Sequence, residues 1–250
     1  MGLTRTTTAY KKINSVKSKI VVVQGGMSAS KNYSIAQILL RYALEKPRII
    51  SVTTDTYDNL KDGSILDFKH IFEELELDWG KCYNKSSHDI NIGKSQIQFR
   101  YISDNKTGAG KSKRRDILYI NEANRFGWEV ASHYISRTHE KVFIDFNPEA
   151  EFWAHTEIPK LRDENGNPIS EHIVVTYKDN EFCPQNERNF IESRKDNASW
   201  WRVYGEGQTG YYSERRIYNY EWCDVVPDRA VKISSRSEER RVGKECRSRW

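Results

Sequence analysis

Residues 19–24 (KIVVVQ) constrain the fold more than any other part of the chain, because they form a continuous apolar run that ends in Gly25-Gly26. Such a run is typical of a strand buried on both faces of a parallel sheet. Apolar residues then recur at the spacing of one helical face between Ile35 and Tyr42, and a second apolar run follows at 48–53. Strand, glycine turn, helix and strand predict a βαβ unit.

Further strand and helix patterns alternate along the chain. Apolar and polar positions alternate on both sides of Gly93-Lys94, which predicts an antiparallel hairpin at the edge of the sheet. We also expect helices at about 58–77, 128–137 and 184–194, and strands at 116–120, 141–146 and 172–177. The predicted fold is therefore α/β, with a mostly parallel central sheet flanked by helices.

Composition and charge exclude several classes of protein. With 37% apolar residues the chain can bury a sizeable core, and its longest apolar run is too short to cross a bilayer. The cysteines show no C-x-x-C spacing and the histidines no H-x-x-x-H pair, so we expect neither a disulfide framework nor a zinc site. We expect an intracellular protein that does not contact a membrane.

Residues 236–250 (RSEERRVGKECRSRW) resemble the translation of a sequencing adapter and are expected not to be native. A solvated basic tail is the alternative. The segment carries six Arg or Lys and three Asp or Glu residues, so without it the net charge falls from +5 to +2. Net charge by itself therefore gives little support for a nucleic-acid-binding function.

Two segments compete for the role of a phosphate-binding loop, which surrounds an anion with backbone N–H groups, a lysine and a helix N-terminus. Segment 25–32 (GGMSASKN) has its lysine in the right place, but Ser30 stands where a second glycine is expected and Asn32 where Ser or Thr is expected. Segment 105–112 (NKTGAGKS) ends in GKS, but the strand predicted at 116 leaves no room for a helix after it. We therefore assign phosphate binding to the earlier segment, with a plain glycine-rich turn as the alternative. Its candidate binding residues are Gly25, Gly26, Ser28, Ala29, Ser30, Lys31 and Asn32.

The predicted strand at 116–120 ends in two polar residues, Asn121 and Glu122. Carboxyl ends of parallel strands meet at one edge of a sheet, so both residues are expected beside the phosphate loop. A glutamate in this place can orient and deprotonate the water that attacks a γ-phosphate. The alternative is that Glu122 and Asn124 cap the following helix.

Several blocks in the same order resemble the ATPase domain of the large terminase subunit of tailed bacteriophages, the motor that packages DNA into a procapsid. The resemblance extends over residues 10–222. The matching blocks are 24–35 (QGGMSASKNYSI), 115–124 (RDILYINEAN), 144–148 (IDFNP) with Phe152-Trp153, 176–182 (TYKDNEF) and 204–207 (YGEG).

This resemblance implies a P-loop ATPase of the additional-strand type, in which one strand lies between the phosphate-loop strand and the strand that ends before Glu122. It implies ATP and Mg²⁺ as cofactors, with Lys31 on the phosphates and Glu122 as the catalytic carboxylate. Asn147 resembles the residue that senses the γ-phosphate, Gln24 is a candidate for the adenine, and Arg137 is either a transition-state arginine or an exposed helix residue. Asn32 and Asn121 replace the usual Mg²⁺-site residues of P-loop enzymes, and their amide oxygens are candidate ligands that lack charge.

The resemblance also implies the domain plan and the partners. We expect an ATPase domain at 1–222, the start of a linker toward a missing nuclease domain at 223–235, and the adapter-like segment after it. The implied partners are double-stranded phage DNA, the portal protein, the small terminase subunit and further copies in a ring, in the cytoplasm of a bacterial host. Lys106, Lys111, Lys113, Arg114 and Arg115 form a basic loop suited to the DNA backbone, or a solvated turn. A nucleotide-binding domain without hydrolysis and a helicase-type or recombinase-type ATPase are the other possible functions.

Overall fold

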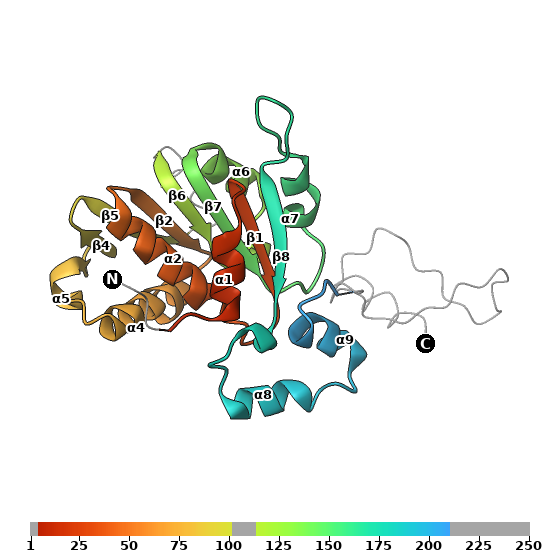
Figure 1. Cartoon of the computed structure of the whole chain (residues 1–250). Helices are drawn as coiled ribbons and strands as arrows, with labels where there is room; N and C mark the ends of the chain where they lie inside the picture. Colours follow the sequence, from red (N-terminus) through yellow and green to blue (C-terminus); the bar gives the residue numbers. More distant parts are fainter. Residues whose placement is uncertain (1–4, 102–113, 211–250) are drawn as a thin grey trace, which may run out of the picture. The chain divides into compact units, whose positions relative to one another are not determined.

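A computed structural model describes residues 5–101 and 114–210. Its centre is a sheet of eight strands in the order β3-β4-β5-β2-β6-β7-β1-β8 (Figure 1). In chain order the strands are β1 (Ile20–Gly25), β2 (Ile49–Thr54), β3 (Tyr83–Asn84), β4 (Asp89–Ile92), β5 (Ser95–Tyr101), β6 (Arg115–Ile120), β7 (Thr138–Phe146) and β8 (Ser170–Val175). The helices are α1 (Thr8–Ser15), α2 (Lys31–Glu45), α3 (Tyr57–Asn59), α4 (Leu66–Glu74), α5 (Trp79–Cys82), α6 (Trp128–Ser136), α7 (Trp153–Thr156), α8 (Gln185–Glu192) and α9 (Ala198–Trp200).

The strand order confirms the additional-strand arrangement. Strand β7 pairs in parallel with β1 on one side and with β6 on the other, so it lies between the phosphate-loop strand and the strand before Glu122. Strand β8 pairs in parallel with β1, and β2 pairs in parallel with both β5 and β6. Strands β4 and β5 form the expected antiparallel hairpin. The carboxyl ends of β1, β6 and β7 therefore meet at one edge.

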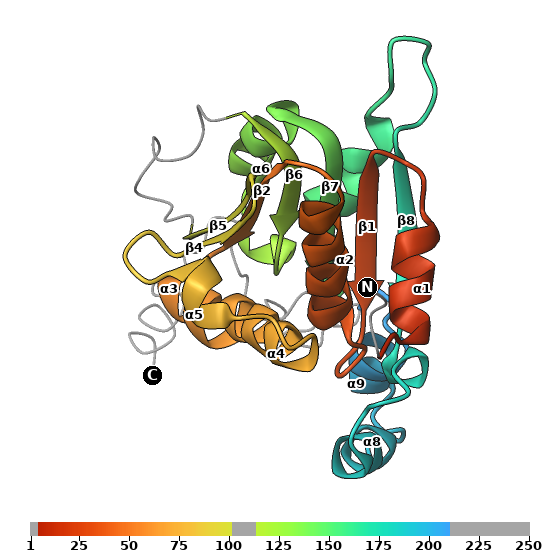
Figure 2. The same cartoon turned by 60° about the vertical axis from the view of Figure 1, so that its left-hand side comes forward.

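Helices cover both faces of this sheet (Figures 1 and 2). Apolar residues of α1, α2 and α4 pack on one face, against alternate residues such as Val21, Val23 and Phe143. Residues of α6 and α7 pack on the other face, against the intervening residues such as Val22 and Ile144. Because both faces are buried, the strands in the middle of the sheet are almost continuously apolar.

Several expected elements have different bounds in the structure. The helix expected at 58–77 consists of α3, a π-helical segment at Leu60–Ile65, and α4, and it ends at Glu74. Helix α1 was not expected; its apolar residues Ala9 and Ile13 pack into the core beside α2. Helices α8 and α9 lie beyond the carboxyl ends of β1 and β8 (Figure 1).

The predicted linker at 223–235 and the adapter-like segment at 236–250 lie outside the described residues, as does the GKS sequence at 110–112. The domain boundary at 222 thus stays a prediction. None of the helices in the described ranges has the length and hydropathy that a membrane span requires.

Candidate functional site

The phosphate-loop candidate connects β1 to α2, because Gly25 ends the strand and Lys31 begins the helix. Ser28 and Ser30 have positive φ values of 52° and 60°, in the left-handed region that favours glycine. Ser30 thus holds the backbone shape expected of the missing second glycine. It is the N-cap of α2 but makes no side-chain cap hydrogen bond, so first-turn amides of a 15-residue helix face the loop without that cap.

The two glycines at the start of the loop are in close contact with the end of β8 and with the segment that follows it. A Cβ on Gly25 would lie 2.6 Å from the carbonyl oxygen of Val175, and one on Gly26 would lie 2.2 Å from that of Tyr204. The amides of Gly26 and Met27 donate to these same two carbonyls, at 3.2 and 2.9 Å. Glycine is required here for close approach of two backbones.

Lys31 is buried under the loop. Its Nζ donates to the carbonyl oxygens of Gly25 (3.2 Å) and Gly26 (3.0 Å) and to Oδ1 of Asn147 (2.9 Å). Burial lowers the pKa of Lys31, while the carboxylates of Asp145 and Glu122 act in the opposite direction. Lys31, at the start of α2, and Asn147, directly after β7, are thus brought together.

Asp145 is a site residue that the sequence analysis did not single out. Its side chain is 2% exposed, and its Oδ1 accepts the Tyr119 hydroxyl at 3.0 Å and the Glu122 amide at 3.3 Å. Burial raises its pKa to about 6, against the lowering effect of the positive charge on Lys31. Its position in the IDFNP block, two residues before Asn147 on the same strand face, was the available signal.

Asn121 and Glu122 follow β6 at the same edge. The Asn121 amide nitrogen donates to Ser64 Oγ at 3.2 Å, but its buried Oδ1 has no hydrogen-bond partner among the described residues. Glu122 adopts φ 54°, and its Oε2 accepts from Arg125 Nε at 3.0 Å and from the side chain of Asn59 at 3.5 Å. The Glu122 side chain is 41% exposed, so solvent reaches it.

Gln24 points to the opposite face of the sheet from Asp145. Its Nε2 donates to the Gly207 carbonyl at 2.7 Å, and its Oε1 lies 3.1 and 3.0 Å from the Nε2 atoms of His155 and His172. These hydrogen bonds connect β1 to β8, to α7 and to the backbone at Gly207. The contacts of Gln24 are therefore structural in this conformation, and its adenine role stays a prediction.

Arg137 and Arg115 lie at the other end of the sheet. Arg137 directly precedes β7, whereas Asn147 directly follows it, so the strand separates them by roughly 30 Å. Within one chain Arg137 thus does not reach the phosphate loop. Arg115 is 3% exposed, with its guanidinium over the Tyr134 ring and bonded to the Tyr134 carbonyl, which corrects its assignment to a DNA-contacting loop.

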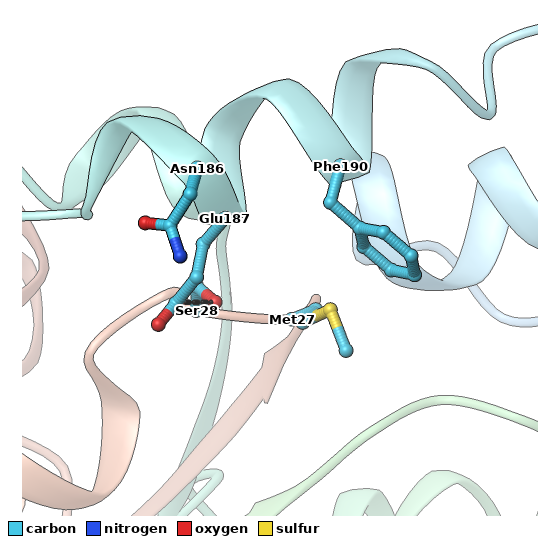
Figure 3. Close-up of a pocket in the computed structure, with 5 residues that line it drawn as sticks. All are labelled: Met27, Ser28, Asn186, Glu187 and Phe190. Carbon is cyan, nitrogen blue, oxygen red and sulfur yellow. Dashed lines mark hydrogen bonds between the residues drawn. The ribbon is translucent and has the colours of Figure 1, made fainter.

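Asn32 is half-buried in the first turn of α2, and Ala29 is buried. Helix α8 covers the tip of the loop, which consists of Met27 and Ser28 (Figure 3). Ser28 Oγ donates to Glu187 of α8 at 2.5 Å, and the Ser28 carbonyl accepts the Asn180 side chain at 2.8 Å. A cavity of about 540 Å³ lies here, lined by Met27, Ser28, Asn186, Glu187 and Phe190.

A second cavity, of about 330 Å³, opens on the other side of Ser30. Its lining combines aromatic, charged and hydroxyl side chains: Arg5, Thr7, Ser30, Tyr33, His70, Glu74, Asn180 and Phe182. The Arg5 guanidinium lies 5.7 Å from the centre of the Phe182 ring. The described residues include no group of three or more His, Cys, Asp or Glu side chains able to hold a metal ion.

A strand, a glycine loop, a helix that begins with a buried lysine, and polar residues at the ends of the next strands define a P-loop domain of the additional-strand type. Comparison with known proteins identifies the family. A family model described as phage terminase large subunit matches residues 17–208, and the chain belongs to this family. Comparison with curated protein sequences gave no match.

Solved structures of large terminases share this fold. The large terminase of a thermophilic bacteriophage, in complex with ATP-gamma-S, matches with a TM-score of 0.60 and 12% identity, over 81% of this chain and 52% of that one. The bacteriophage HK97 large terminase matches with 0.59 and 11%, over 82% and 51%. The large terminase ATPase domain of Thermus phage P74-26 matches with 0.52 and 14%, over 79% and 92%. The chain thus spans about half the length of the first two of these large terminases.

Proposed function

We propose that this chain is the ATP-hydrolysing motor domain of a phage DNA-packaging terminase. The observation that carries the proposal is the convergence at one sheet edge of Lys31, Asn147 and Glu122, next to a helix N-terminus without a side-chain cap. A triphosphate needs such N–H groups and positive charge. The large terminase of the thermophilic bacteriophage, which is a complex with ATP-gamma-S, supports this choice of ligand.

Phosphate binding by this loop requires a rearrangement at Lys31. Its Nζ is now satisfied by the carbonyls of Gly25 and Gly26, and a bound phosphate replaces them with a charge-assisted contact. Asn147 holds the ammonium from the side of β7 at 2.9 Å, so it can report to the sheet which partner Lys31 has. This is a physical basis for the γ-phosphate-sensing role expected of Asn147.

Hydrolysis is assigned to Glu122 as the general base for the attacking water. In this conformation its carboxylate is paired with Arg125, and the Arg125 Nε also lies 3.7 Å from Asp55. Release of Glu122 from Arg125 frees the carboxylate oxygen for a water molecule, while Asp55 remains as a partner for the arginine.

The residues present fit a Mg²⁺ ion, which prefers oxygen ligands and usually binds with phosphates and one or two protein groups. The unpartnered Asn121 Oδ1 and the Asp145 carboxylate are oxygen donors at the same edge, and the Asn32 amide belongs to the loop. When bound, Mg²⁺ would neutralise charge that develops on the β- and γ-phosphate oxygens.

The nucleoside end of ATP is assigned to the cavity beside Ser30. Phe182 offers a ring that is 53% exposed, Arg5 lies over that ring, and Asn180 supplies amide groups for polar contacts. Aromatic faces with a few polar groups are typical of base-binding pockets. This location places the base on the α2 face, away from Gln24.

Family membership supports the wider assignments, which are double-stranded DNA as the track, the portal protein and small subunit as partners, a ring of copies and a bacterial cytoplasm. It counts against a helicase-type or recombinase-type ATPase. A nucleotide-binding domain without hydrolysis remains the second candidate, and the Glu122–Arg125 pair and the uncharged Asn121 favour it.

Phosphate release with DNA and portal present tests the proposal. Lys31→Ala should abolish turnover with the fold retained, because it removes the buried phosphate contact. Lys111→Ala, in the GKS sequence, is the matched control and should keep parental turnover. Parental turnover in Lys31→Ala, or its loss only in Lys111→Ala, would refute the choice of loop.

A further inference from the structure

Asn121 removes a charge from the place where P-loop enzymes usually hold an aspartate, and the structure offers a carboxylate next to it. Strands β6 and β7 are paired so that Ile120 lies opposite Ile144, and Asn121 and Asp145 are the next residue on each strand. Neighbouring strands lie about 4.8 Å apart. The backbone of Asn121 continues the direction of β6, because its backbone N–H donates to the Thr53 carbonyl oxygen of β2 at 2.9 Å.

Both side chains lie on the same face of the sheet. The Tyr119 hydroxyl reaches Asp145, and side-chain alternation puts residue 121 on the same face as residue 119. Asn121 is 4% exposed and Asp145 2% exposed, so neither is a surface residue. Within residues 5–101 and 114–210 the Asn121 Oδ1 is a buried acceptor without a partner, which is a costly arrangement unless a donor or a cation completes it.

Asp145 also has capacity that the protein does not use. Its Oδ1 takes both hydrogen bonds, from Tyr119 and from the Glu122 amide, and its Oδ2 accepts none within the described part of the chain. Its charge acts on Lys31, which lies on the other side of β7 at the phosphate loop. Asp145 is therefore between the phosphate lysine and the vacant acceptor of Asn121.

We propose that Asp145 supplies the acidic Mg²⁺ ligand of the nucleotide site, with Asn121 Oδ1 as its neutral neighbour. In the usual P-loop arrangement this carboxylate follows the strand that corresponds to β6. Here it lies at the end of β7, one strand closer to the loop. This inference rests on the proposed ATP function. It explains how the chain tolerates Asn121, since the charge is kept at the same edge of the sheet.

The test measures metal binding without hydrolysis, on the full chain. Mn²⁺ is titrated by electron paramagnetic resonance in the presence of ATP-gamma-S, for the parental chain and for Asp145→Asn. We expect Asp145→Asn to weaken Mn²⁺ binding at least roughly tenfold, because an amide lacks the charge that holds the cation. The double variant Asn121→Asp/Asp145→Asn, which returns the carboxylate to β6, should recover affinity to within about threefold.

Two controls separate metal binding from packing. Tyr119→Phe removes one hydrogen bond to Asp145 but keeps its charge, so Mn²⁺ affinity should stay at the parental value. Asp67→Asn removes another acid on the same face, in α4, whose pKa burial and the charge of Asp145 raise to about 7; it should also bind Mn²⁺ normally. ATP-gamma-S binding in EDTA shows whether each variant keeps a folded site.

Parental Mn²⁺ affinity in Asp145→Asn would overturn the inference. So would an equal loss of ATP-gamma-S binding with Mn²⁺ and in EDTA without recovery in the double variant, since that pattern belongs to a residue needed only for packing. Failure of the parental chain to bind ATP-gamma-S at all would instead contradict the proposed ATP function.

Discussion

Gly26→Ala should detach the segment after β8 from the phosphate loop. An added Cβ would lie 2.2 Å from the Tyr204 carbonyl oxygen and 2.9 Å from its carbon, far inside the normal contact distance. Both are backbone atoms, so no side-chain rotation relieves the clash. The 204–207 turn must move away, and the bonds from Met27 to Tyr204 and from Gln24 to Gly207 weaken with it.

The magnitude follows from those contacts. Each hydrogen bond contributes about 1 kcal/mol net, and overpacking at a rigid contact costs about 1–3 kcal/mol. If both bonds are lost, the free energy of unfolding falls by about 3–5 kcal/mol, a large part of the roughly 5–15 kcal/mol typical of a domain. Gly63→Ala is the matched control, because an added Cβ would meet no described atom from outside its own helical turn within 4 Å; it should be neutral or slightly stabilising.

Guanidinium unfolding followed by tryptophan fluorescence measures the effect. Trp201 packs against the Tyr177 ring at a centroid distance of 6.3 Å, so it adds a signal from the segment that must move to the emission of the seven tryptophans. Unfolding of Gly26→Ala at the parental denaturant concentration, with unchanged Trp emission, would show that Gly26 and Tyr204 leave room for a methyl group and would refute the predicted clash.

Three further predictions concern the loop and the sheet edge. Glu122→Gln should keep ATP binding but lower kcat at least ~100-fold, and phosphate release at the parental rate would remove Glu122 from catalysis. Ser30→Gly should raise stability by about 0.5 kcal/mol, because relief of a left-handed serine outweighs the added chain entropy; a lower melting temperature would contradict this. Burial raises the pKa of Asp145 to about 6 from 3.8, so its stabilising contribution is full below pH 3.8 and lost as the pH rises through 6. Burial lowers the pKa of His172 to about 4 from 6.5, so its contribution is lost as the pH falls through that range. Asp145→Asn should thus lose stability more steeply than the parental chain between pH 6 and 4, and parallel curves from pH-dependent unfolding would refute the assignment.

The sheet was predictable because its central strands are buried on both faces and therefore leave a continuous apolar signal. The place of the loop between β1 and α2 was predictable from context, since a helix was expected after it and 31–45 supplies one; phosphate binding by the loop stays a prediction. Helix α1 gave a weaker signal, because it is only eight residues long and polar on average, with two of its buried residues being Ala9 and Ile13. The π-helical turn at Leu60–Ile65 has no periodic signature that distinguishes it from the helices on either side.

Arg137 and Asp145 show why the site was only partly predictable. Sequence distance from a motif does not say at which end of a strand a residue lies, and Arg137 directly precedes β7 at the edge opposite the loop. Asp145 lies within the strand expected at 141–146, but the strand pattern does not say which side chains of neighbouring strands face it. In the structure it is a buried member of β7 whose charge is balanced by Lys31.

The departures from the phosphate-loop pattern concern residue types more than physical requirements. The pattern asks for a left-handed residue before the lysine, and Ser30 adopts that conformation at a cost that glycine would avoid. It asks for a polar group at the end of the neighbouring strand, and Asn147 bonds directly to Lys31. It asks for negative charge at the same edge, and the buried carboxyl group of Asp145, on the neighbouring strand, is the one that we propose for this role. A sequence motif describes one way to meet these requirements, and the fold permits a neighbouring strand to meet them instead.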